Sequence, residues 1–231
     1  MATIGNDVTE KITSEVNLFN LIMQQNVCEN EFNREYALLA NIQLCAAIEF
    51  RVTSLNDLYL DLNNSRLHVL AKLTTANGTN IDANIAAQIN LTLYSMYRKI
   101  GVELTGRNVG DKSQLYPYRS FPESLHYYSK EPQNTRLLCE GWTKNKIGHV
   151  NVNAVGKNNA GLNARAVNYS RRIVVELIGR SHANVFNKNR LLCPNIDFNI
   201  KLMPSPNYIV CKWAALAANA AQNNFKLVIL S

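Results

Sequence analysis

Residues 66–78, RLHVLAKLTTANG, decide the fold class, because apolar and polar side chains alternate along them. Every second residue from Leu67 to Leu73 is apolar, and this period gives a β-strand one apolar face. The pair Asn77-Gly78 that follows is typical of a tight turn between two strands. We therefore expect a half-buried strand that ends in a hairpin turn.

The same alternation recurs in residues 99–104, 197–202 and 225–229. Residues 172–178 are almost continuously apolar and rich in β-branched side chains, which predicts a strand covered on both faces. Residues 208–213 are a further candidate strand. Many short strands favour an all-β sandwich or jelly roll with antiparallel sheets packed face to face. We expect the following residues to be buried between the sheets: Leu67, Val69, Val102, Leu104, Val175, Leu177, Ile200 and Leu202.

Helical patterns are scarce. Residues 118–129 are predicted to form a helix, because Pro117 and Pro122 suit the turn that begins one and Leu125 shares a face with Tyr128.

Two segments rich in small or polar residues lie between the expected strands. Residues 151–168 are rich in Asn, Gly and Ala, which predicts a long exposed loop. The Ala-rich residues 214–221 are either a short helix or a loop.

Charge divides the chain into two parts. Residues 1–35 hold two basic and six acidic residues, a net charge of −4, so the whole-chain charge of +7 leaves +11 for residues 36–231. We interpret residues 1–35 as an acidic N-terminal arm and residues 36–231 as a single β domain. The basic body permits contact with DNA. Scattered, solvated charge is the alternative, because no run of Lys and Arg exceeds the pair Arg171-Arg172.

Several function classes lack their motifs. The four histidines, His68, His126, His149 and His182, do not have the spacing of metal ligands, and the short motifs of zinc proteases, serine hydrolases and phosphate-binding loops are absent. We expect a protein that is not an enzyme, with no catalytic residue, cofactor or metal. The odd number of widely spaced cysteines, five, predicts reduced thiols. No signal peptide and no membrane span is apparent, so we expect a product that is not secreted.

Two short motifs have the character of structural corners. In Tyr116-Pro117-Tyr118-Arg119, proline restricts the backbone, the two tyrosine rings are expected to bury area, and Arg119 is expected to bridge to a carboxylate or to carbonyl oxygens.

The second motif is Gly179-Arg180 with His182. It predicts a strand end or bulge that reorients the chain.

In their order and spacing, these motifs resemble the double jelly-roll major capsid proteins of Polinton (Maverick) elements and adintoviruses. The resemblance also rests on segments 14–19, 93–97 and 102–104, and on 190–192 with 200–202. One departure is the approach to Tyr116, where Ser113-Gln114-Leu115 stands in place of the Thr-Asn-Thr tract of that family.

The resemblance implies a fold and a function. It implies an antiparallel jelly roll with one or two short helices in loops, and a structural virion protein that forms an icosahedral shell around double-stranded DNA. Its partners would be itself, as a homotrimer of full-length subunits, and other capsid proteins, with non-specific DNA contact. It would be found in the virion and, during assembly, in the host nucleus or cytoplasm.

The resemblance further implies which part of the family's subunit this is. The chain ends at Ser231, about where the first of the family's two rolls finishes, so we expect the product of a truncated gene, a domesticated relic or an isolated first domain. Three copies of one roll would leave half of a six-roll ring empty, so this chain alone is not expected to close the usual shell.

The alternative is a non-catalytic, lectin-like jelly roll that binds a glycan through exposed aromatic rings. The candidate rings are Tyr127, Tyr128, Trp142 and Trp213. Their clustering on one exposed patch would favour this alternative, and their burial would favour the capsid hypothesis.

Overall fold

A computed structural model describes residues 30–37, 47–53, 58–75, 77–80, 86–129, 133, 135–149, 158–169, 173–206, 211–213 and 225–230. The chain divides into two units, residues 1–35 and residues 36–231. In the first unit only residues 30–35 are described, and they form neither helix nor strand. All elements described below belong to the second unit.

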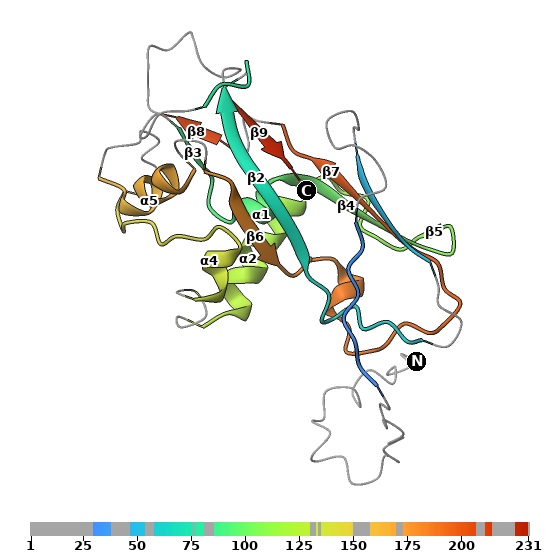
Figure 1. Ribbon diagram of the computed structural model, residues 1–231. Helices are drawn as coiled ribbons and strands as arrows, with labels where there is room; N and C mark the ends of the chain where they lie inside the picture. The colour runs from blue at the N-terminus through green and yellow to red at the C-terminus, as the bar shows by residue number, and fades with distance from the viewer. Residues whose placement is uncertain are drawn as a thin grey trace, which may run out of the picture. The chain divides into compact units, whose positions relative to one another are not determined.

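The described part of the second unit is mostly β, with antiparallel sheets and a few short helices (Figure 1). Its strands are β1 (Ile48–Val52), β2 (Leu67–Thr75), β3 (Ala86–Gln88), β4 (Tyr97–Leu104), β5 (Arg107–Asn108), β6 (Val175–Gly179), β7 (Phe198–Pro204), β8 (Cys211–Trp213) and β9 (Phe225–Ile229). Its helices are α1 (Thr92–Ser95), α2 (Tyr116–Tyr127), α4 (Arg136–Cys139), α5 (Ala160–Asn168) and the 3-10 helix η2 (Asn184–Asn187).

The strands form three sheets. The first sheet has the order β1-β7-β4-β5, the second has the order β6-β2-β9, and the third pairs β3 with β8. Every named strand pair is antiparallel.

The pairings nest into two long antiparallel ribbons. In the first ribbon, Ile48 pairs with Leu202 in the first sheet and Ala71 pairs with Val175 in the second sheet. An isolated bridge between Leu60 and Leu192 lies between these two pairings. The chain from β1 to β2 therefore runs antiparallel to the chain from β6 to β7, and the ribbon crosses from one sheet to the other.

The second ribbon runs in the same manner from β2 to β4. Strand β2 pairs with β9 in the second sheet, β3 pairs with β8, and β4 pairs with β7 in the first sheet. Two strands belong to both ribbons. As a result β7 lies between β1 and β4, and β2 lies between β6 and β9.

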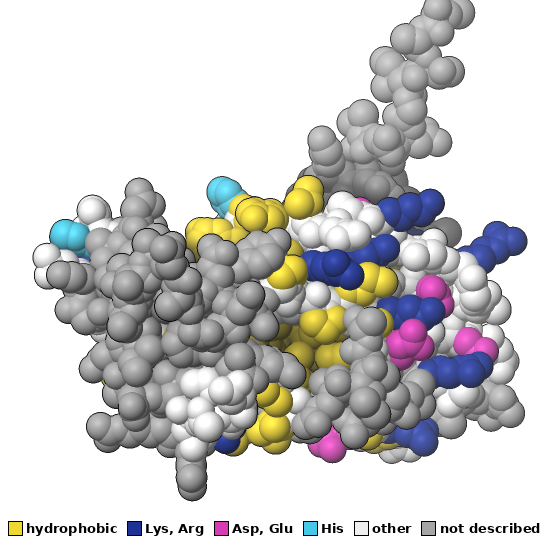
Figure 2. Space-filling model, turned by 90° about the horizontal axis from the view of Figure 1, so that it is seen from above, with side chains coloured by type: hydrophobic (Ala, Val, Ile, Leu, Met, Phe, Trp, Pro, Cys, Tyr) yellow, Lys and Arg dark blue, Asp and Glu magenta, His cyan; other side chains and the backbone are white. Residues whose placement is uncertain are grey.

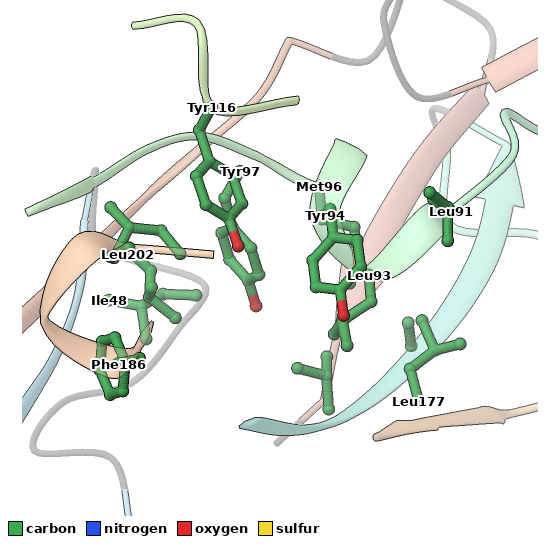
Figure 3. Close-up of a cluster of buried hydrophobic side chains, with 14 of the residues drawn as sticks. Ile48, Leu91, Leu93, Tyr94, Met96, Tyr97, Tyr116, Leu177, Phe186 and Leu202 are labelled. Carbon is green, nitrogen blue, oxygen red and sulfur yellow. The ribbon is translucent and has the colours of Figure 1, made fainter. Parts of the chain in front are cut away.

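The inward faces of the first and second sheets contribute to one hydrophobic cluster, an arrangement consistent with a β-sandwich. Figure 3 shows Ile48, Phe186 and Leu202 on one side of this cluster and Leu177 on the other, with Tyr94 between them. Of the eight residues predicted to be buried, four are fully buried, Val69, Val102, Leu177 and Leu202. The other four are partly buried and pack against the cluster, namely Leu67, Leu104, Val175 and Ile200.

The strand and turn predicted from residues 66–78 are confirmed. Strand β2 ends at Thr75, and the Thr75 amide donates to the Thr79 carbonyl over 2.9 Å across the turn. Gly78 has a φ of +79°, a backbone conformation that glycine adopts without steric cost. Among the described residues after the turn, Asn80 forms one bridge with Thr74, and residues 81–85 lie outside the described residues.

The prediction of a strand covered on both faces at residues 172–178 is wrong. In β6, Leu177 is buried, but Glu176 and Ile178 are exposed, so only one face is covered. A continuous apolar run cannot distinguish a strand covered twice from one whose outer face is apolar and open.

The helix predicted for residues 118–129 is present as α2, displaced toward the N-terminus. It begins at Tyr116, so Pro122 lies inside the helix rather than in the turn before it. Tyr128 follows the last helical residue with an extended backbone, so it does not share a helical face with Leu125.

The loop predicted for residues 151–168 is wrong for residues 160–168, which form α5, and residues 151–157 lie outside the described residues. The Asn159 side chain caps this helix by accepting from the Leu162 amide. Leu162 and Ala166, one turn apart, are buried, and the Asn cap together with the burial of this apolar face favours a short helix. Of the candidate strand 208–213, residues 211–213 form β8, whereas residues 208–210 and 214–221 lie outside the described residues.

Candidate functional site

The two signature motifs meet in the fold. Tyr116, at the start of α2, is buried, and its hydroxyl accepts a hydrogen bond of 3.1 Å from the His182 backbone amide. Tyr94 of α1 packs edge-on against both partners, with ring centroids 6.4 Å from Tyr116 and 4.5 Å from His182. Figure 3 shows the Tyr94 and Tyr116 rings from these two elements in the same buried cluster. We call this junction of α1, α2 and the end of β6 the polar corner.

Glu123 on α2, one helical turn after Arg119, joins the charged residues of both motifs. Its Oε1 accepts a hydrogen bond of 2.7 Å from Arg119 Nε, and its Oε2 lies 3.0 Å from His182 Nδ1. Arg119 also donates to the Asn184 side chain in η2. The prediction that Arg119 bridges to a carboxylate is therefore confirmed, and the bridge extends to His182.

The His182 ring is buried and bonded at both nitrogens. Its Nε2 lies 3.1 Å from the Ser124 hydroxyl and its Nδ1 faces Glu123. Burial lowers the pKa of His182 below its usual value, and the Glu123 carboxylate opposes this effect. In the neutral ring, Nδ1–H donates to Glu123. The Ser124 hydroxyl has a single proton, and two acceptors compete for it: the Ser120 carbonyl at 2.8 Å and His182 Nε2 at 3.1 Å.

Gly179 and Arg180 occur where β6 ends, as the motif predicted. A Cβ on Gly179 would lie 2.6 Å from Leu93 Cδ2 and 2.9 Å from the Tyr94 hydroxyl, so this site has no space for a side chain. Arg180 donates to the Asn63 side chain and to the Phe186 carbonyl. The arginine thus ties the end of β6 to η2 and to the segment before β2.

The prediction that both tyrosines of the Tyr116–Arg119 motif bury area is wrong for Tyr118, which is 69% exposed. Because α2 begins at Tyr116, residues 116 and 118 lie about 200° apart around the helix and face opposite sides.

Sequence reasoning missed Glu140, the residue that follows α4. Its side chain is fully buried beside the Tyr94 hydroxyl, and the Glu140 Cγ would also lie 2.9 Å from a Cβ on Gly179. Among the described residues, neither carboxyl oxygen of Glu140 has a hydrogen-bond partner of normal geometry. Burial raises its pKa to about 7, although Tyr94, Arg136 and Arg66 favour the charged form. No local sequence pattern around Glu140 predicts that its side chain is buried.

The polar corner has the chemistry of a structural junction. Its groups are mostly paired with one another, and in the described part of the chain no group of three or more His, Cys, Asp or Glu could hold a metal ion. None of the helices in the described ranges is both long and apolar enough to span a membrane.

Two of the four rings proposed for glycan stacking are described, and neither is freely exposed. Tyr128 and Trp142 pack against the hydrophobic cluster. Tyr128 lies under the Arg136 guanidinium at 5.3 Å, and Trp142 contacts Phe121 at a centroid distance of 6.0 Å. The side chains of Tyr127 and Trp213 lie outside the described residues.

Comparison with known proteins adds no relationship: no protein-family model matches this chain, and no curated protein matches it.

Proposed function

We propose that this chain is a structural virion protein, the first jelly roll of a double jelly-roll major capsid protein of the Polinton and adintovirus kind. The observation that carries the proposal is the nesting of its strand pairs. Strand β7 lies between β1 and β4 while β2 lies between β6 and β9, and each antiparallel ribbon passes from one sheet to the other. Ribbons that pass from one sheet to the other support the assignment of a jelly roll, an architecture that viral capsid domains use.

The polar corner supports the same proposal. The two motifs that carry the resemblance are far apart in the sequence, yet Tyr116 of the first accepts a hydrogen bond of 3.1 Å from the amide of His182 in the second, 66 residues later. Motifs that make a shared contact are expected to be retained together in a family, because each needs the other to satisfy its buried polar groups.

A regular jelly roll has eight strands, and the proposed roll departs from this arrangement in one region. Between β4 and β6, the described residues form the two-residue β5 and helices α2, α4 and α5. These helices pack on the sandwich, since α2 contacts β4 and α4 contacts β6. We interpret them as elements that take the place of strands at one end of the roll.

On this proposal the protein functions by geometry. Capsid subunits bury surface against copies of themselves and need no catalytic group. The excess of basic residues in 36–231, +11 as counted from the sequence, would assist DNA packaging through phosphate contacts that carry no base specificity.

Assembly is the direct test. The purified chain should be examined by multi-angle light scattering over a wide concentration range and by negative-stain electron microscopy. We expect concentration-dependent oligomers with ring or lattice geometry. A protein that stays monomeric throughout would contradict the capsid proposal.

The lectin-like alternative is tested in parallel. Binding to immobilised glycans by the monomer, lost when Trp142 or Trp213 is replaced by alanine, would support a binding module. Absence of such binding together with ring-shaped oligomers would support the capsid proposal.

A further inference from the structure

On the outward face of the first sheet, basic side chains are matched by acidic ones. Lys201 on β7 lies 3.7 Å from Glu49 on β1 and 3.3 Å from Glu103 on β4, and Arg51 lies 3.9 Å from Asp197. Figure 2 shows a face of the molecule on which Lys and Arg side chains are likewise interspersed with Asp and Glu. Charges of both signs arranged in this way leave no strong field of one sign.

A second charged region lies where β2 begins and β6 ends. Leu67 pairs in register with Gly179. One step beyond this pair, Arg66 and Arg180 are therefore at opposite positions of the two chains. Both donate to Asn63: Arg66 Nη1 donates to its carbonyl at 3.3 Å, and Arg180 donates to its side chain. Like charges opposite one another destabilise a sheet, so the fold holds these two guanidinium groups together at a cost.

Two more basic residues belong to a segment that contacts Asn63. The Asn63 side-chain amide donates to the Asn189 side chain over 3.2 Å, and Lys188 and Arg190, on either side of Asn189 in the sequence, are exposed. Figure 1 shows the same proximity, because η2 and the chain that follows it lie beside the segment that leads into β2.

A fifth basic residue, Arg136, lies at the start of α4. Its guanidinium is 5.3 Å from the centre of the Tyr128 ring, and α4 packs on β6. Burial, and after it repulsion from Arg136 and Arg180, lowers the pKa of Arg66, so both of these arginines lie close enough to Arg66 to affect its charge. We call the following five residues, of which only Arg180 is not exposed, the basic surface: Arg66, Arg136, Arg180, Lys188 and Arg190.

Acidic side chains near the basic surface are engaged elsewhere. Among the described residues, no carboxylate forms an ion pair with any of its five members. Asp61 accepts hydrogen bonds from residues 63–64 in the turn before β2, and Glu176 is paired with His68 at 2.8 Å. Burial raises the pKa of Glu140 to about 7, so this carboxyl is only partly ionised at neutral pH. The described residues therefore leave a net positive charge here.

We propose that the basic surface binds the phosphates of a nucleic-acid backbone without reading the base sequence. Guanidinium groups bind phosphate oxygens through two parallel hydrogen bonds, and four of the five members are arginines. Because the members come from separate segments of the chain, they suit a row of phosphates better than a single bound ion. The choice of nucleic acid rests on the proposed capsid function, and the inference names the surface that packaged DNA contacts.

The salt dependence of binding tests the surface. Fluorescence anisotropy should be measured with two labelled duplexes of unrelated sequence, between about 50 and 200 mM NaCl, where log K falls linearly with log salt by about 0.9 for each phosphate neutralised. Five contacts give a slope of about −4.5 for both sequences. Arg66→Gln and Arg190→Gln should each reduce the steepness by about 0.9.

The matched control is Arg107→Gln, which removes the same charge from an exposed position on β5 in the first sheet. This variant should leave the slope unchanged, and thermal melts show whether all three variants are folded. Slopes that do not change in Arg66→Gln and Arg190→Gln, or that change equally in Arg107→Gln, would overturn the proposal.

Competition identifies the class of partner. Duplex DNA has one charge per about 1.7 Å of its axis and releases bound counterions when it is neutralised. At equal charge concentration, poly-glutamate and vesicles that contain phosphatidylserine should therefore displace the labelled duplex less effectively than unlabelled duplex does. Equal displacement by either competitor would contradict the assignment to nucleic acid.

The outcomes separate this inference from the capsid proposal. DNA binding that responds to Arg66→Gln and Arg190→Gln, in a chain that stays monomeric at every concentration, would support the basic surface and contradict the capsid function. Rings or lattices formed by a chain whose DNA binding ignores both variants would refute the basic surface and leave the capsid proposal standing.

Discussion

The buried carboxyl of Glu140 leads to a pH dependence of stability that can be measured. Its pKa is raised from 4.5 to about 7 in the folded protein, so the folded state binds the proton more tightly than the unfolded chain does. The stability of the fold is then greatest when the group is protonated in both states, below about pH 4.5. It falls as the pH rises through about 7 and is constant above that.

The size of the effect follows from the shift in pKa. One unit corresponds to about 1.4 kcal/mol, so a rise from 4.5 to about 7 gives an upper limit of about 3 kcal/mol between pH 4.5 and pH 8. Glu140→Gln keeps the shape of the side chain and removes the titration. We expect this variant to be more stable than the unchanged protein at pH 8, by up to about 3 kcal/mol, and equal to it or about 1 kcal/mol less stable at pH 5.

Urea unfolding at pH 5, 6, 7 and 8 measures both proteins. The quantity to follow is the difference in free energy of unfolding between the unchanged protein and Glu140→Gln at each pH. His182 affects both proteins equally and in the opposite direction, because its lowered pKa reduces the stability of the fold as the pH falls. Glu49→Gln is the matched control, since Glu49 is exposed on the first sheet. Parallel curves for the unchanged protein and Glu140→Gln between pH 5 and pH 8 would refute the reasoning.

Three further changes test the packing, each by urea unfolding against the unchanged protein. Gly179→Ala should cost about 1–3 kcal/mol, because its Cβ would lie 2.6 Å from Leu93 Cδ2; a neutral result would mean that the corner can relax. Leu202→Ala should lower the free energy of unfolding by about 2–5 kcal/mol, since Leu202 on β7, the strand between β1 and β4, is only 1% exposed. A loss of less than about 1 kcal/mol would contradict its place in the core. Tyr116→Phe leaves the buried His182 amide without its acceptor and should cost about 1–3 kcal/mol, whereas Tyr118→Phe, at an exposed ring, should cost nothing measurable.

Local sequence patterns predicted the elements whose cause is local. The alternation from Leu67 to Leu73 and the Asn77-Gly78 turn were sufficient for β2, because strand faces and tight turns depend on neighbouring residues. The same alternation predicted β4 and β7.

The errors arise where the cause is not local. Nothing within residues 172–178 indicates whether a second layer covers Ile178, since that depends on elements far away in the sequence. The Asn-rich composition before α5 concealed a cap at Asn159. Glu140 is buried only because α1, α4 and the end of β6 converge on it, and the contact of Glu123 with His182 likewise needs two distant segments to meet.

The nesting of the ribbons has a consequence for how the chain folds during synthesis. Ile48 pairs with Leu202, 154 positions later, so β1 leaves the ribosome long before the strand that completes it. At roughly 5–20 residues per second, that interval is about 8–30 s. For most of this time β1 and β2 have none of the strands that pair with them in the sheets, because β6, β7 and β9 have not yet been made. Such a topology folds slowly, and we expect the nascent protein to depend on chaperones and to give more correctly folded product when translation is slowed after Thr75 or expression is carried out in the cold.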